Sequence, residues 1–401
     1  MKDFALGYYF TLLWARLFAL GSLFFLLMSS VVLLMGFSAD STTVYSLLLM
    51  GFVNFYIISV QHGAIPFPRN RGGWYSRGAT YSFLLMFFGL MVAVFLPLFS
   101  PTMSSWSFAG WTMYRAGFLI YLLLQHALLL VYRWRSRKWE FDTLFGLFFF
   151  MAMVWGILSV LPVNYFGNLH LLFIGFQLNS FLACAYFMLP RFSRMVRERL
   201  RGGLWMGKVA FALVNLAVSF NFAAFFLRVY FPAFGKWFTD VRVMETTTYL
   251  LQIAALLLMM GLLLYIAGVG RFVVKALKVA AFAHVFSIMY FLLGAYYSMY
   301  VALGDYALKT FHQHFMISAM MLLALSMGYH WYMLNFSLPG SSHPIPFVLG
   351  YSLLLLFPLW DRVLIPASVL LLLWFFLEVY RNREILITDF RNVLREFYRA
   401  F

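Results

Sequence analysis

The stretch DYALKTFHQHFMISAMMLLALSMGYHW, residues 305–331, decides how the rest of this chain is interpreted. It places three of the eight histidines in one apolar helix. At about 100° per residue, the side chains of His312 and His314 point roughly 200° apart on that helix. The pair therefore cannot bind one small ion together, but each histidine can reach a different large planar ligand on its own side of the helix.

The composition excludes a soluble globular domain. Of the 401 residues, 64% are hydrophobic, 21% aromatic and only 10% charged, which predicts an all-α polytopic membrane protein. Cys184 is the single cysteine, so the sequence holds no disulfide, no covalent haem attachment motif and no iron–sulfur site. Any cofactor must therefore be held by histidine.

The apolar runs predict a single transmembrane domain over residues 1–401. Each run is long enough to cross a bilayer, the connecting loops are short, and no soluble domain fits between them. The chain is therefore expected to form a bundle of twelve transmembrane helices, at residues 5–37, 43–61, 79–100, 113–132, 143–162, 167–190, 204–230, 246–268, 272–302, 310–335, 345–359 and 363–380.

The basic residues set the expected orientation. With the N-terminus in the cytoplasm, 22 of the 29 lysines and arginines fall on the inner side. This distribution follows the positive-inside rule and places both termini in the cytoplasm. The basic, amphipathic segment 381–401 is then expected to rest on the anionic inner leaflet. The net charge of +16 thus indicates a lipid bilayer as partner and no nucleic acid.

Three histidines are candidate metal ligands at the outer end of the bundle. In this orientation His312 and His314 lie about one turn below the outer surface, and His170 lies at the same end of the sixth helix, so they can converge on one site. The alternative is that each is an interfacial histidine bonded to loop backbone. His284 lies in mid-helix, where an unpaired imidazole is costly, and is expected to ligate or to orient a ligand.

The remaining histidines carry no predicted chemistry. His62 and His343 are expected in inner loops, and His126 is expected to make a structural hydrogen bond. His330 and Trp331 are expected to anchor the inner interface.

The tenth helix resembles that of subunit I of the haem–copper oxidase superfamily. In that family an aspartate seven residues before a His-x-His opens the helix and a His-Trp closes it, as Asp305, His312, His314 and 330–331 do here. The segment NYFGNLHLLFIGFQLNSFLACAYFMLPRF, residues 164–192, resembles the sixth helix of the cbb-type oxidases and nitric oxide reductases. The resemblance implies that His312 binds a high-spin haem b and His314 a low-spin one.

A second resemblance is to the NnrS family, twelve-helix haem-containing membrane proteins linked to nitric oxide stress. The stretch AHVFSIMYFLLG, residues 283–294, places His284 at the position of a family histidine. The stretch MLPRFSR, residues 188–194, resembles the end of the family's sixth helix. These resemblances imply a bacterial inner-membrane protein.

The chain departs from the oxidases at the copper centre. No histidine occurs between His170 and His284, so the seventh helix offers Asn215 and Asn221 where the family has imidazoles. Asn168 takes the copper-ligand position of the sixth helix, and the second helix, STTVYSLLLMG at 41–51, lacks a haem ligand. Because amides are poor copper ligands, we expect copper binding to be unlikely and no oxygen reduction.

Three functions follow. A haem protein holding one or two haem b groups would serve in nitric oxide response or respiratory electron transfer. Alternatively, a degenerate oxidase-like chain would be a structural or accessory subunit, with other respiratory-complex subunits as partners. A transporter is the third reading, disfavoured because the spans contain almost no acidic residues to couple ions.

Overall fold

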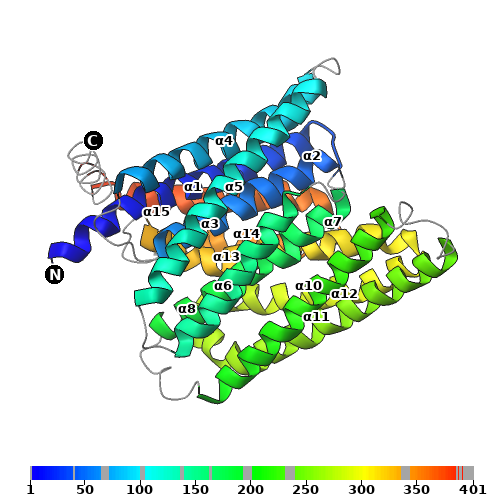
Figure 1. Ribbon diagram of the computed structural model, residues 1–401. Helices are drawn as coiled ribbons and strands as arrows, with labels where there is room; N and C mark the ends of the chain where they lie inside the picture. Colours follow the sequence, from blue (N-terminus) through cyan, green and yellow to red (C-terminus); the bar gives the residue numbers. More distant parts are fainter. Residues whose placement is uncertain are drawn as a thin grey trace. The chain divides into compact units, whose positions relative to one another are not determined.

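The described part of the chain folds as helices (Figure 1). The computed structural model describes residues 2–38, 41–64, 72–99, 104–135, 140–161, 165–192, 201–230, 240–335, 344–384, 387 and 391. No strand occurs in these ranges. The predicted all-α class is therefore confirmed.

The membrane character is also supported. Each of the twelve predicted runs overlaps a helix, but not every one has the length and composition of a candidate span. Within the described ranges eight do: 14–34, 42–62, 77–98, 167–186, 205–228, 243–270, 281–302 and 361–381. The helices Leu144–Ser159 and Pro344–Leu354 are apolar but shorter. A polytopic helical membrane protein fits these findings, and the number of twelve spans and the cytoplasmic termini stay predictions.

The helices group into two compact units, which are described separately. Unit 1 comprises residues 1–135 and 324–401. Its elements are α1 (Lys2–Leu34), α2 (Thr42–Tyr45), η1 (Ser46–Val53), α3 (Asn54–Ala64), α4 (Gly72–Phe99), α5 (Ser104–Arg135), the second half of α13 (Lys309–Asn335), α14 (Pro344–Leu354), η7 (Asp361–Val363) and α15 (Leu364–Arg381).

Unit 2 comprises residues 136–323 and holds all four candidate ligands, His170, His284, His312 and His314. Its elements are α6 (Glu140–Ser159), α7 (Tyr165–His170), η3 (Leu171–Leu178), α8 (Asn179–Phe192), α10 (Arg201–Tyr230), α11 (Asp240–Leu277), η5 (Lys278–Ala280), α12 (Ala281–Ala302), η6 (Tyr306–Leu308) and the first half of α13. The prediction of one transmembrane domain is not tested by this grouping.

The boundary between the eighth and ninth predicted runs is wrong. The ninth run was placed at 272–302, but α11 continues through Arg271 and Lys275 to Leu277, and α12 begins only at Ala281 after a turn of 3₁₀-helix. Basic residues indicate where the chain leaves the membrane, but they do not end a helix. Lys, Ala and Leu are good helix formers, so α11 continues past that point. Most of the predicted tail, 381–401, lies outside the described residues.

Two of the spans contain π-helix. The segments are η1, Ser46–Val53, and η3, Leu171–Leu178. Both belong to spans of which 89% is buried inside the protein. In a π-helix each N–H bonds to the carbonyl five residues earlier, and such segments often mark functional sites.

Asparagines and a tyrosine satisfy carbonyl groups around these segments. After η3, the Asn179 amide donates to the Gly175 carbonyl at 2.8 Å. After η1, the Tyr114 hydroxyl of α5 donates to the Met50 carbonyl at 2.9 Å and accepts from the Asn54 amide at 2.9 Å. A carbonyl that no partner satisfied would cost several kcal/mol in an apolar surrounding, so these side chains help to stabilise the irregular turns.

Helices α4 and α5 of unit 1 touch through their backbones. A methyl group built on Gly89 would lie 2.5 Å from the backbone nitrogen of Tyr114, and one on Gly110 would collide with the backbone of Ala93. The Ser107 hydroxyl donates to the Ala93 carbonyl at 2.9 Å, across the same contact. Small residues allow this close approach, as in many membrane helix pairs.

Candidate functional site

His312 is held in a defined orientation by α12. Its Nδ1 lies 2.7 Å from the backbone carbonyl oxygen of Gly294. A carbonyl only accepts, so Nδ1 carries the proton and Nε2 carries the lone pair. A backbone carbonyl on Nδ1–H is a common way to orient a histidine that binds a metal through Nε2.

Gly294 allows this contact because it has no side chain. A methyl group at that position would lie 2.6 Å from the Met316 sulfur, on the next turn of α13 after His312. The glycine thus brings α12 close to α13 at the level of His312. Gly294 therefore has two roles: its lack of a side chain lets α12 approach α13, and its carbonyl oxygen orients the imidazole of His312.

His170 lies beside His312. The two ring centroids are 6.4 Å apart and the ring planes differ by 14°. The Phe225 ring of α10 packs against His170, with centroids 4.9 Å apart. The structure therefore brings together two of the three predicted metal ligands, and their role as ligands stays a prediction.

The other two candidates lie elsewhere. His314 is buried, 8% exposed, and its side chain leaves α13 roughly 200° around the helix from that of His312. The Nε2 of His284 lies 3.1 Å from the Tyr265 hydroxyl of α11. His284 precedes Gly294 by ten residues, which is about 15 Å along α12, so it is far from His312. Its geometry is that of a structural hydrogen bond between α11 and α12.

The described residues contain no group of three or more His, Cys, Asp or Glu side chains that could hold a metal ion. The His170–His312 pair supplies two imidazole nitrogens. Such a pair fits a metal whose remaining positions are filled by another molecule, as a porphyrin fills four positions of haem iron.

Asn215 of α10 belongs to a hydrogen-bonded network. Its side-chain oxygen accepts from the indole N–H of Trp155 at 2.8 Å, and its amide donates to the Asn179 oxygen at 3.1 Å and the Phe211 carbonyl at 2.9 Å. The network joins α6, α8 and α10 beside η3. Both ends of the Asn215 side chain are thereby engaged within the protein.

We expect Asn215→Leu to lower the free energy of unfolding by about 2 kcal/mol, because it leaves the Trp155 N–H and the Asn179 oxygen buried without this partner. Thermal unfolding in detergent, followed by tryptophan fluorescence, measures the change. Asn221→Leu on the same helix is the control, since Asn221 is hydrogen-bonded to Ala217 of its own helix. Equal stability of the two variants would contradict a structural role for the network.

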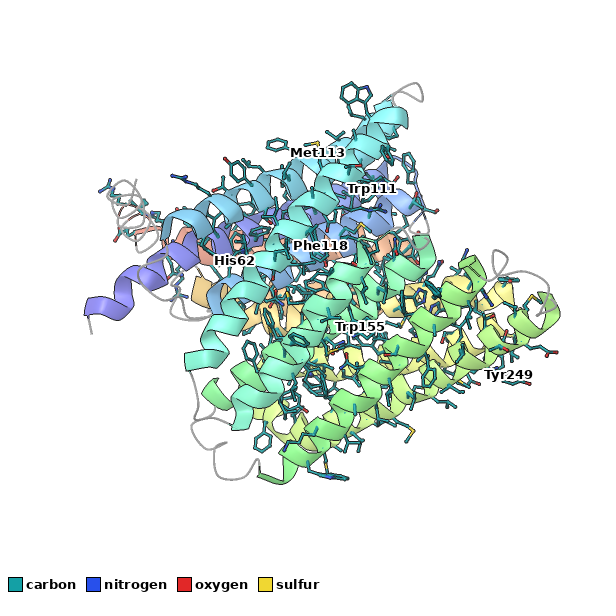
Figure 2. All side chains as sticks on the ribbon, viewed as in Figure 1. His62, Trp111, Met113, Phe118, Trp155 and Tyr249 are labelled. Carbon is teal, nitrogen blue, oxygen red and sulfur yellow. The ribbon has the colours of Figure 1, made fainter. Side chains whose placement is uncertain are left out.

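Sequence reasoning missed His62. The residue was expected in a loop, but it ends the candidate span at 42–62 and is fully buried in α3 (Figure 2). Its Nδ1 lies 2.5 Å from the Tyr75 hydroxyl, which accepts from the Gln125 amide at 3.2 Å. Phe18 stacks on the imidazole with centroids 5.2 Å apart. The helix continues beyond its predicted end at residue 61, which is why His62 was misplaced.

The structure describes some of the remaining predicted residues and not others. Trp331 is buried in unit 1, where its indole donates to Ser59 at 3.3 Å, so the prediction that it anchors the interface is wrong. The side chains of His126 and His330, and the whole of His343, lie outside the described residues.

Comparison with known proteins adds no family: no family model matches the chain, and no curated protein matches it.

Proposed function

We propose that this chain is a haem-binding integral membrane protein of the haem–copper oxidase subunit I type. In this proposal it has twelve spans, both termini in the cytoplasm of a bacterium, and no copper centre. The resemblance of the tenth helix to that family supports it, as do the candidate spans and the all-helical fold.

The orientation of His312 is the observation that carries the proposal. With its Nδ1–H on the Gly294 carbonyl, its Nε2 lone pair is available as an axial ligand in an apolar helix. His314, buried on another side of α13, is the candidate ligand for a second haem b. A haem held here supplies one-electron chemistry, which suits a role in nitric oxide response or respiratory electron transfer.

The hydrogen bonds of Asn215 support the part of the proposal that the chain binds no copper. Copper would need further imidazoles from the seventh helix, where the side chain of Asn215 is used by Trp155 and Asn179. An amide is a poor copper ligand even when it is not engaged in this way.

The test is the absorption spectrum of the purified full-length protein. We expect a Soret band with at least one haem b per chain. His312→Ala should lower haem affinity at least roughly tenfold, because it removes the axial nitrogen. Pyridine haemochrome analysis of the protein as purified measures the occupancy.

The control is His284→Gln, which keeps a nitrogen or oxygen near the Tyr265 hydroxyl. It should retain the haem content of the parent. A parent with no Soret band, or a His312→Ala, His314→Ala double variant with full haem content, would contradict the proposal.

The alternative is a structural or accessory subunit of a larger respiratory complex that binds little or no haem. The engaged Asn215 favours it in one respect, because the side chain serves packing where the family has ligands. Copurification separates the two functions. A haem-loaded chain purified alone favours the first, and a stoichiometric complex without haem on this chain favours the second.

A further inference from the structure

Helices α11 and α12 of unit 2 share an exposed apolar face, called here the α11–α12 face. Its side chains recur every three to four residues, which is the spacing of one side of a helix. The stretches 246–270 and 281–303 contain no charged residue. The exposed side chains of this face are Tyr249, Ile253, Leu256, Met260 and Leu263 on α11, and Phe282, Val285, Met289, Leu293, Tyr296 and Tyr300 on α12.

Tyrosines lie at one end of the α11–α12 face. Tyr249, near the start of α11, is 65% exposed. The Thr248 hydroxyl donates to the Ala302 carbonyl at 3.2 Å, which places the end of α12 at the same level. Tyr300 is exposed within about one turn of that level, and its hydroxyl lies 2.9 Å from that of Tyr296. Three tyrosines thus gather where the face ends.

Trp205 of α10 marks the opposite end and is 64% exposed. Helices α10 and α11 run antiparallel, and Gly261 of α11 lies against Ala210 and Val214 of α10. Counted from this contact, Trp205 lies about seven residues to one side and Tyr249 about twelve residues to the other. At about 1.5 Å per residue, the two aromatic side chains are roughly 28 Å apart along the helices.

Unit 1 shows the same arrangement independently on α15. Trp360, just before the helix, is 62% exposed, and Tyr380, in its last turn, is 68% exposed. The guanidinium of Arg383 lies 4.8 Å from the centroid of the Tyr380 ring. The two aromatic residues are roughly 30 Å apart along the helix, and the stretch 363–377 between them contains no charged residue. The large apolar side chains exposed between them are Val369, Leu373 and Phe376.

The spacing of these aromatic residues matches a lipid bilayer. Its hydrocarbon core is about 30 Å thick, and tryptophan and tyrosine prefer the headgroup region on either side. A protein partner would not require this spacing. Lys208 is exposed about one turn closer to the centre than Trp205, and its long side chain can reach the headgroups.

We infer that the α11–α12 face and the exposed side of α15 are in contact with lipid. Trp205 and Tyr249 lie at the two headgroup regions in unit 2, and Trp360 and Tyr380 do so in unit 1. Any protein subunit that binds this chain therefore binds it on another surface. The inference is independent of the proposed function, because it does not involve haem.

The unmodified protein gives the first test. The purified full-length chain is placed in vesicles of phosphatidylethanolamine and phosphatidylglycerol and photolabelled with a lipid-soluble carbene precursor, and mass spectrometry locates the labelled residues. Leu256 and Leu373 are exposed, whereas Leu258 and Leu371 on the same helices are buried and serve as matched controls. We expect at least roughly tenfold more label on the exposed leucine of each pair, because close packing keeps the reagent from the buried one. Equal labelling within the pairs would overturn the inference.

Spin labels give the second test, in the same vesicles. Leu256→Cys and Glu245→Cys each carry one nitroxide, with the buried Cys184 replaced by alanine. Oxygen should relax the label at 256 and a water-soluble nickel chelate the label at 245, so the ratio of the two accessibilities should differ at least roughly tenfold between the sites. A label at 256 that nickel reaches would place the face in water. A label there that neither reagent reaches would show that protein, such as a second copy of the chain, covers it. Either result would contradict contact with lipid.

Discussion

Gly110→Leu is expected to lower the free energy of unfolding by about 3 kcal/mol. A side chain at this position would meet the backbone of Ala93 and the carbonyl oxygen of Gly89, neither of which can rotate away. Helices α4 and α5 would have to separate, losing the Ser107 hydrogen bond as well. Unfolding in bicelles or thermal denaturation in detergent measures the loss.

The control for this substitution is Gly146→Leu in α6. A methyl group built on Gly146 meets no heavy atom within 4 Å, so the same change in side chain should be nearly neutral there. If both variants unfold together with the parent, the close approach of α4 and α5 contributes little to stability.

Gly294→Leu is expected to lower haem affinity roughly 10- to 100-fold, the effect typical of losing a group that orients a metal ligand. A side chain there would overlap the sulfur of Met316 and push α12 away from α13. The carbonyl oxygen would then leave Nδ1 of His312. Titration of the haem-free variant with haemin, followed at the Soret band, measures the affinity.

A second variant tests whether the overlap with Met316 causes the loss of haem affinity. The double variant Gly294→Leu, Met316→Ala removes the sulfur that a new side chain would meet, so it should recover part of the lost affinity. Gly304→Leu is unsuitable as a control because Gly304 has a φ of +99°. Gly270→Ala serves instead, since its nearest neighbour would lie at 3.6 Å. Unchanged affinity in Gly294→Leu would contradict the role of the carbonyl.

The sequence predicts where helices lie better than it predicts how they end. Long apolar runs have no other stable form in a bilayer, so the all-α class follows directly. The end of a helix depends on backbone hydrogen bonds, which cannot be predicted from the polarity of the side chains. Arg271 and Lys275 were expected in a loop for this reason, and so was His62.

The candidate site shows the same division. Matching depth on separate helices indicated that His170 could approach His312, and the structure places their rings 6.4 Å apart. The same depth criterion also grouped His314 with them, because it does not tell on which side of α13 a histidine lies. The partner of His284 is Tyr265, 19 residues earlier on the preceding helix α11, and no spacing in the sequence indicates that pair.

The π-helical segments have a consequence for how this protein can vary over evolution. A π-helical turn is equivalent to an α-helical turn into which one residue has been inserted. Loss of one residue within η3 would return it to α-helix, and His170 before it and Asn179 after it would each keep their present face. A described helix without a π-helical segment has no such reserve, because a lost residue rotates everything beyond it by about 100°. We therefore expect the deletion of one residue within η1 or η3 to preserve the same core.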